Sequence, residues 1–145
     1  MKLSTRTRYG TRFMVHLAQY GAKTPVLLRD VAHREDISMK YLSQIVIPLK
    51  THGLIGSVRG ARGGYFLTRH PERITLKEIL EALEDSLVLV DCTRESDLCA
   101  RTSVCATRRL WKELTEHMKR YLETVSLQDL IQMTDQETEH PLYTI

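Results

Sequence analysis

The apolar pattern of this chain changes at Gly53, from the spacing of helices to the alternation of strands. Before this point, apolar residues recur at steps of three and four, which is typical of helices that bury one face. After it, two short alternating runs at 54–58 and 65–68 flank the segment Arg59-Gly-Ala-Arg-Gly-Gly64. Glycines between alternating runs predict a β-hairpin, here with a cationic tip. We therefore expect a mainly α fold with one small hairpin.

Three helices are expected before the hairpin. We place them at residues 5–20, at about 28–35, and from Ser38 to about Thr51. The Ser38 side chain can cap the third helix, and Pro48 inside it should cause a bend. Helix, short strand, helix, turn, helix and hairpin is the order of a winged helix-turn-helix. We assign this architecture to residues 1–90 and treat it as a DNA-binding domain.

The second half of the chain predicts one long helix. A capping box at Thr75 and Glu78 first begins a shorter helix. The long helix then carries an apolar stripe at steps of three and four, formed by Trp111, Leu114, Met118, Tyr121 and Val125. Such a stripe packs either within the monomer or as a seam between two copies. Because the helix has few local partners, we expect residues 107–133 to form dimerisation helices and 134–145 to be a flexible tail.

Charge is divided unevenly along the chain, although the formal net charge is only +3. Residues 1–70 hold twelve Lys and Arg against three Asp and Glu, a net charge of +9, and residues 71–145 have a net charge of −6. An uneven surface charge alone would explain this division. A basic half with an acidic remainder nevertheless fits nucleic acid better, because clustered cations neutralise phosphates. A homodimer would then select a palindromic operator in double-stranded DNA.

The sequence predicts a cytoplasmic protein with no membrane partner. No stretch approaches the roughly 20 apolar residues of a membrane span, and the N-terminus lacks the apolar region of a signal peptide. No phosphate-binding glycine loop or nucleophile elbow is present, so an enzyme is not expected. The six histidines fall on predicted polar faces, at helix ends or in the tail, and none is expected to be a ligand.

Two sets of side chains are candidates for reading DNA. In the third helix these are Ser38, Lys40, Tyr41, Ser43 and Gln44. Gln44 could make a bidentate contact to adenine, and Lys40 could reach guanine or a phosphate. At the hairpin tip, Arg59 and Arg62 suit the negative potential of a minor groove. A solvated helix face or a protein-interaction module remains the alternative for the same pattern.

Cys92, Cys99 and Cys105 are the chain's only cysteines, and they occur in one predicted loop at 91–106. Three thiols cannot all pair within one chain, and the cytosol keeps thiols reduced. Gathered thiolates suit a soft metal or an iron–sulfur cluster. A zinc site, a bare thiol switch and cysteines without a shared role remain the alternatives.

Residues Met1–Ile131 resemble the Rrf family of winged-helix regulators, which includes IscR, NsrR and RirA. The resemblance is carried by the opening Met1–Gly10, by Ile37–Gln44, by Gly53–Tyr65, and by the cysteine loop with the following Leu110-Trp111. It implies a homodimeric repressor or activator, with the helix and wing residues named above contacting DNA. It also implies a 2Fe–2S or 4Fe–4S cluster on Cys92, Cys99 and Cys105, which would sense iron, redox state or nitric oxide.

The chain departs from the IscR-like and NsrR-like members of this family at the fourth cluster ligand. IscR-like members place a histidine three residues after the third cysteine, where this chain has Arg108. NsrR-like members use an acidic residue of the partner's first helix, whereas the first acidic residue here is Asp30. The first cysteine gap is also one residue longer than in IscR-like members. The fourth ligand and the cluster type therefore stay open, with Asp91, Glu95, Asp97, solvent or a small thiol as candidate ligands, and a cluster-free regulator remains the alternative function.

Overall fold

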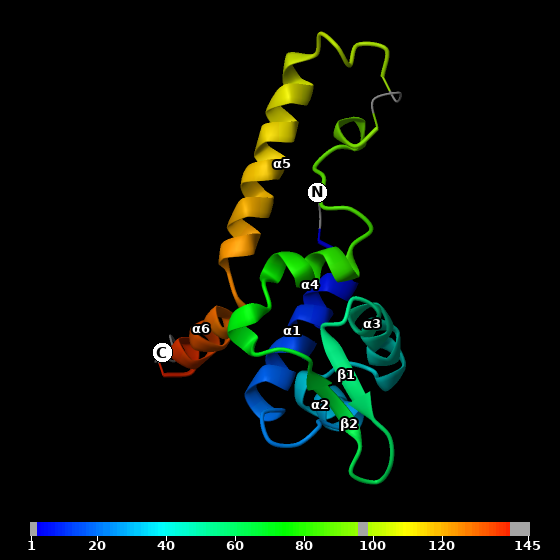
Figure 1. Ribbon diagram of the computed structural model, residues 1–145, viewed down its shortest axis with the longest axis vertical. Helices are drawn as coiled ribbons and strands as arrows, with labels where there is room; N and C mark the ends of the chain where they lie inside the picture. Colours follow the sequence, from blue (N-terminus) through cyan, green and yellow to red (C-terminus); the bar gives the residue numbers. More distant parts are fainter. Residues whose placement is uncertain (1–2, 96–98, 140–145) are drawn as a thin grey trace, which may run out of the picture.

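The computed structural model describes residues 3–95 and 99–139. It contains α1 (Thr5–Tyr20), α2 (Leu28–Glu35), α3 (Met39–Thr51), β1 (Ile55–Val58), β2 (Gly64–Leu67), α4 (Leu76–Leu83), α5 (Ala106–Thr124) and α6 (Leu127–Glu139), with short 3₁₀ turns at Pro71–Arg73 and Asp91–Thr93. Figure 1 shows α1 to α4 and the hairpin in one compact body. Helix α5 extends from this body like an arm, and the cysteine segment lies at its far end. The expected helix order and hairpin are both present.

Helix α1 lies at the centre of the core. Its Phe13, Met14 and Leu17 are buried, and they belong to one cluster with buried residues of α3, β1, α4 and α6. Gly10 allows α4 to approach α1 closely, because a Cβ at this position would collide with the Leu83 side chain. Helix α3, which follows the turn after α2, therefore packs against α1, as do α4 and α6.

Side-chain caps begin four of the helices. Ser4 accepts a hydrogen bond from the Thr7 amide in α1, and Ser38 accepts one from the Tyr41 amide in α3. The predicted capping box of α4 is present. A similar reciprocal arrangement starts α6, where Ser126 and Asp129 exchange hydrogen bonds. Each cap satisfies amides that have no partner inside the helix, so these boundaries follow directly from the sequence.

The hairpin is joined to the chain before α2. Its strands are antiparallel, with Ile55 opposite Leu67 and Val58 opposite Gly64. Val26 and Tyr65 exchange two backbone hydrogen bonds of 2.8 Å each, which adds the short extended piece as a third, one-residue strand. Gly64 has a φ of +143°, and a Cβ there would collide with the Val26 carbonyl. Glycine is therefore required where the β1–β2 hairpin, which is the wing of this fold, crosses the chain leading into α2.

Helix α5 packs little within the monomer. Thr115 is its only buried residue, and Trp111, Leu114 and Tyr121 of the predicted stripe are 38%, 48% and 65% exposed. Only Val125, just after the helix, is buried in the core region. No helix in the described part of the chain is long and apolar enough to cross a membrane.

Two expectations differ from the structure. Residues 134–139 continue α6 instead of beginning a flexible tail, because no Gly or Pro interrupts the helix there. Residues 140–145 lie outside the described part. His16 is only 2% exposed, although we placed the histidines on polar faces or helix ends. Its Nδ1 lies 3.1 Å from the Glu35 carboxylate in α2, which gives this buried ring a polar partner.

Glu84 ties the end of α4 to the start of α1. Its carboxylate accepts hydrogen bonds from the Ser4 amide at 2.8 Å and from the Thr7 hydroxyl at 2.6 Å. Burial on its own would raise the pKa of the Glu84 carboxyl. The hydrogen bonds from Thr7 and Ser4 outweigh burial, so the pKa lies below its ordinary value.

We expect Glu84→Ala to reduce the free energy of unfolding by about 1–3 kcal/mol at neutral pH, because two donors lose a charged acceptor. A lowered folded-state pKa stabilises the fold above the unfolded pKa of about 4.3, and this contribution is lost as pH falls through the folded value. Urea unfolding at a series of pH values should therefore show the difference between wild type and variant shrinking in acid.

Glu81→Ala is the matched control, because Glu81 is exposed on the same helix. It should leave stability nearly unchanged. A Glu84→Ala variant as stable as the Glu81→Ala variant at neutral pH would show that the hydrogen bonds to Ser4 and Thr7 do not hold α1 and α4 together.

Candidate functional site

The first turns of α3 present a polar, exposed face. The side chains of Lys40 and Gln44 are exposed and make no hydrogen bond or ion pair with the residues that the structure describes. The two serines are partly committed to the backbone, since Ser38 caps the helix and the Ser43 hydroxyl donates to the Met39 carbonyl at 2.8 Å. Lys40 and Gln44 are therefore the freest of the predicted reading residues on this face.

Tyr41 has a mixed environment. It is half-buried, and its ring meets the Tyr9 ring edge-on at 5.9 Å between centroids. This contact joins the first turn of α3 to α1. Tyr41 thus helps to orient α3, the predicted DNA-reading helix (called the reading helix below), in the folded chain.

The wing tip carries two unpaired cations. Arg59 and Arg62 are exposed, and neither makes a hydrogen bond or ion pair within residues 3–95 and 99–139. The last turn of α3 is tied to the wing, because Lys50 Nζ donates to the Ser57 hydroxyl in β1 at 2.7 Å. This link fixes the base of the wing relative to the reading helix and leaves the tip open to solvent.

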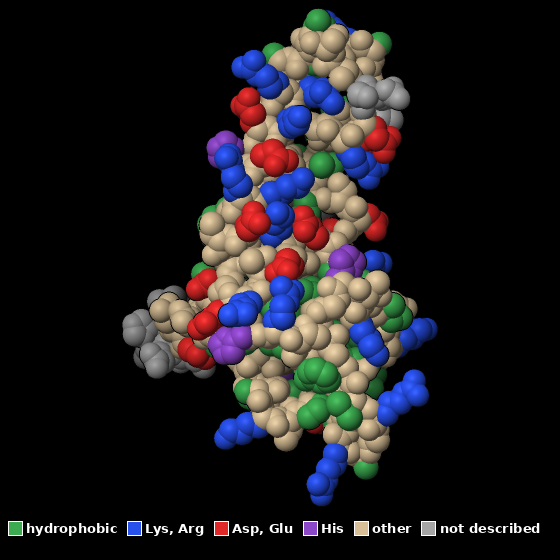
Figure 2. Space-filling model, viewed as in Figure 1, with side chains coloured by type: hydrophobic (Ala, Val, Ile, Leu, Met, Phe, Trp, Pro, Cys, Tyr) green, Lys and Arg blue, Asp and Glu red, His purple; other side chains and the backbone are tan. Residues whose placement is uncertain are grey.

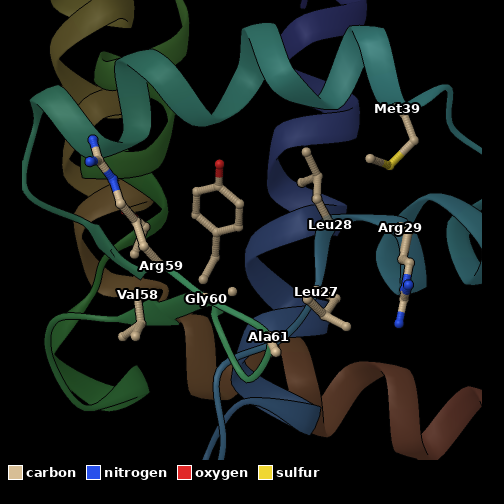
Figure 3. Close-up of a pocket in the computed structure, with 11 residues that line it drawn as sticks. Leu27, Leu28, Arg29, Met39, Val58, Arg59, Gly60 and Ala61 are labelled. Carbon is tan, nitrogen blue, oxygen red and sulfur yellow. The ribbon is translucent and has the colours of Figure 1, made fainter.

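A hollow of about 570 Å³ separates the reading helix from the wing. Figure 3 shows Met39 and Arg29 on one side of it and Val58 and Arg59 on the other. Arg59 was predicted from the sequence as a DNA contact, whereas Arg29 and Met39 were not. Neither residue could be recognised from the sequence, because an arginine and a methionine at the starts of two helices do not interrupt the apolar spacing of those helices.

Charge on the visible face follows the division found in the sequence. In Figure 2, acidic side chains gather along α5 and near α6, where they alternate with basic ones. Around the wing and the lower body, Lys and Arg project outward with little acidic surface among them. This is the electrostatic pattern expected of a protein that places its winged half against phosphates.

The three cysteines are free and lie along the segment that leads into α5. Cys92 is half-buried in the turn Asp91–Thr93, Cys99 is exposed, and Cys105 is the half-buried residue just before α5. Within the described residues, no three His, Cys, Asp or Glu side chains are arranged as a metal site. Asp97, one of the proposed fourth ligands, lies outside the described residues.

The surroundings of Cys105 favour its thiolate. Its Sγ lies 3.2 Å from the Thr107 hydroxyl, and the backbone N–H groups of Arg108 and Thr107 lie at the start of α5. The Thr107 hydrogen bond, followed by that of the Arg108 amide, lowers the pKa of the Cys105 thiol. A thiol at the start of a helix with donors around it is suited to metal binding or oxidation.

Arg108 holds the two ends of the loop together. Its Nε donates to the Cys92 carbonyl at 2.8 Å. This residue stands where the resemblance predicts a histidine ligand in IscR-like proteins. In this chain the position is therefore structural, because a guanidinium binds a backbone carbonyl and is no ligand for a metal.

Comparison with known proteins identifies the family. The model of the Rrf2 family, described as an iron-dependent transcriptional regulator, matches residues 3–133. Protein rrf2 of Nitratidesulfovibrio vulgaris is 42% identical over 131 residues, which is 90% of this chain and 87% of that protein. The resemblance found in the sequence is therefore confirmed.

Two solved structures share the fold. CymR, the global cysteine regulator of Bacillus subtilis, superposes with a TM-score of 0.77 at 34% identity, covering 92% of this chain and 98% of that one. IscR of T. potens gives a TM-score of 0.75 at 31% identity, covering 99% and 94%. With its mainly α winged-helix architecture, this chain belongs to the Rrf2 family of transcriptional regulators, which bind DNA and are not enzymes.

Proposed function

We propose that this protein is a homodimeric repressor whose operator binding is controlled by an iron–sulfur cluster on Cys92, Cys99 and Cys105. One observation carries the proposal: the chain's only three cysteines are all free, and they lie on the one segment that leads into α5. The family's description as iron-dependent supports the iron, and the similarity to an IscR supports a cluster. The signal is then iron, redox state or nitric oxide, and the protein acts in the cytoplasm.

The cysteine loop fits a cluster in its chemistry. Soft sulfur ligands are those that iron–sulfur clusters use, and the lowered pKa of Cys105 favours the thiolate form that binds iron. The three side chains would have to draw together to bind, because the described residues form no assembled metal group. A bound cluster would supply a redox-sensitive and ligand-sensitive centre. The protein's part is to fix the two ends of the loop through Arg108 and to connect it to α5.

The proposed dimer uses the exposed stripe of α5. Trp111, Leu114 and Tyr121 form an apolar face that the described part of the monomer leaves uncovered. In a two-fold dimer this face would be buried against its copy, and two reading helices would meet a palindromic operator. Residues 107–133 would then be the dimerisation helices, 91–106 the sensing loop and 1–90 the DNA reader.

A thiol switch without metal is the second candidate. The similarity to CymR, named as a cysteine regulator, favours it, as do the unassembled thiols and the lowered pKa of Cys105. In this alternative, oxidation or modification of a thiol replaces cluster loss as the signal, while the DNA-reading surface stays the same.

For the wing, we expect Arg62→Ala to weaken binding to operator and random duplexes alike. The dependence of log affinity on log salt should become shallower by about one per protomer, because one phosphate or groove contact is lost. Titrations at several salt concentrations measure this, with Lys112→Ala on exposed α5 as the control. An unchanged slope in the folded Arg62→Ala variant would remove Arg62 from the interface.

For the reading helix, Gln44→Ala should lower operator affinity by about 1–3 kcal/mol and leave random-sequence binding nearly intact, because a base-specific pair of hydrogen bonds is lost. The operator is first obtained by selection from randomised duplexes. Gln132→Ala, an exposed glutamine on α6, is the matched control. Equal losses on both kinds of DNA would show that Gln44 positions the protein and reads no base.

For the cysteine loop, alanine at each of Cys92, Cys99 and Cys105 should prevent cluster assembly under anaerobic conditions, because no spare cysteine exists. The three variants should share one operator affinity, displaced from that of the loaded protein by a coupling of about 1–3 kcal/mol. Iron and sulfide content, visible absorption and operator titration measure this, with Ser103→Ala as the loop control. A colourless wild type whose DNA binding still responds to oxidant would instead establish the thiol switch.

A further inference from the structure

The hollow between α3 and the wing has no occupant assigned to it. It is bounded by the start of α2, the start of α3 and the hairpin, and its lining includes Leu27, Leu28, Met39, Val58 and Tyr65. In Figure 3, Leu27 and Leu28 lie between the side of the hollow that carries Arg29 and Met39 and the side that carries Val58 and Arg59. It lies between α3 and the wing, the two elements that the proposed function places against DNA.

Two arginines lie on opposite sides of this hollow. Arg59 has no polar partner among the described residues. Arg29 lies 3.7 Å from Asp30, but their side chains are 75% and 57% exposed, and such a surface pair contributes little. Both guanidinium groups are therefore available to an anion that spans the hollow, and Asp30 is the one acidic group beside them on α2.

The space between the arginines is largely apolar. Met39 is 46% exposed and Val58 is 49% exposed, although each stands at an end of its element next to charged neighbours. Exposed apolar side chains beside free arginines match a partner in which anionic groups alternate with apolar carbon. The strand of a DNA duplex has this chemistry, because each phosphate is joined to the next through a deoxyribose.

We propose that the hollow seats the sugar–phosphate ridge of one DNA strand, between the groove read by α3 and the groove entered by the wing. Arg29 and Arg59 bind phosphates on the two sides of the hollow, and Met39 and Val58 pack against deoxyribose. The inference rests on the proposed placement of α3 and the wing on DNA. It adds Arg29 and Met39 to the interface and makes their contribution independent of base sequence.

The two side chains should differ in their dependence on salt. Arg29→Ala should weaken binding to a random-sequence duplex by about three- to tenfold and make the salt dependence shallower by about one per protomer, because a phosphate contact is lost. Arg29→Lys should restore most of the slope. Met39→Ala should weaken binding to random and selected operator duplexes by a similar factor and leave the slope unchanged, since methionine carries no charge.

Arg34→Ala is the matched control, because Arg34 lies on the same helix and stacks over Tyr20, away from the hollow. It should not change the slope. Circular dichroism confirms that each variant is folded.

Three further outcomes would each contradict part of the argument. Wild type without affinity for any duplex would overturn the proposed function itself. A folded Arg29→Ala variant with the wild-type slope, beside a weakened Arg62→Ala, would overturn only the seating of the strand. A Met39→Ala loss that disappears when thymine is replaced by uracil would show that Met39 reads a base methyl group, which also contradicts the proposed sugar contact.

Discussion

The packing around α1 is the constraint on which the rest of the structure depends. Helices α2, α3, α4 and α6 and strand β2 all contact it, and its buried face supplies Phe13, Met14 and Leu17 to the core. Gly10 permits the close approach of Leu83, and Glu84 adds a polar tie at the same joint. Because α3 and the wing both contact α1, the core sets their relative position, and the hydrogen bond from Lys50 to Ser57 adds a direct link between them.

Much of the fold could be predicted from local signals. Caps at Ser38 and Thr75 and the apolar spacing placed the starts of the helices to within a residue or two, and the glycines placed the hairpin. The errors arose where the deciding partner is distant or where no local stop signal exists. His16 is buried because Glu35, on another helix, gives it a partner, and α6 continues because a polar sequence without Gly or Pro need not end a helix.

The candidate site was only partly visible in sequence. Gln44, Arg59 and Arg62 are exposed as expected, and their roles in DNA binding are still predictions. Arg29 and Met39 could not be identified, because lining a hollow between three elements leaves no periodic trace in the chain. The cysteine spacing indicates a shared ligand but does not determine how the loop closes, since closure depends on contacts such as that of Arg108 with Cys92.

The length of α5 separates the cysteine segment from the wing. Its 19 residues span about 28 Å at 1.5 Å per residue, with Cys105 at the end remote from the body. The wing points the opposite way in Figure 1. A protein already seated on an operator would thus still expose Cys99 to the surrounding solution. Under the proposed function, small oxidants, nitric oxide or iron chelators would reach the thiols without waiting for dissociation, so the speed of a response would not be limited by the lifetime of the protein–DNA complex.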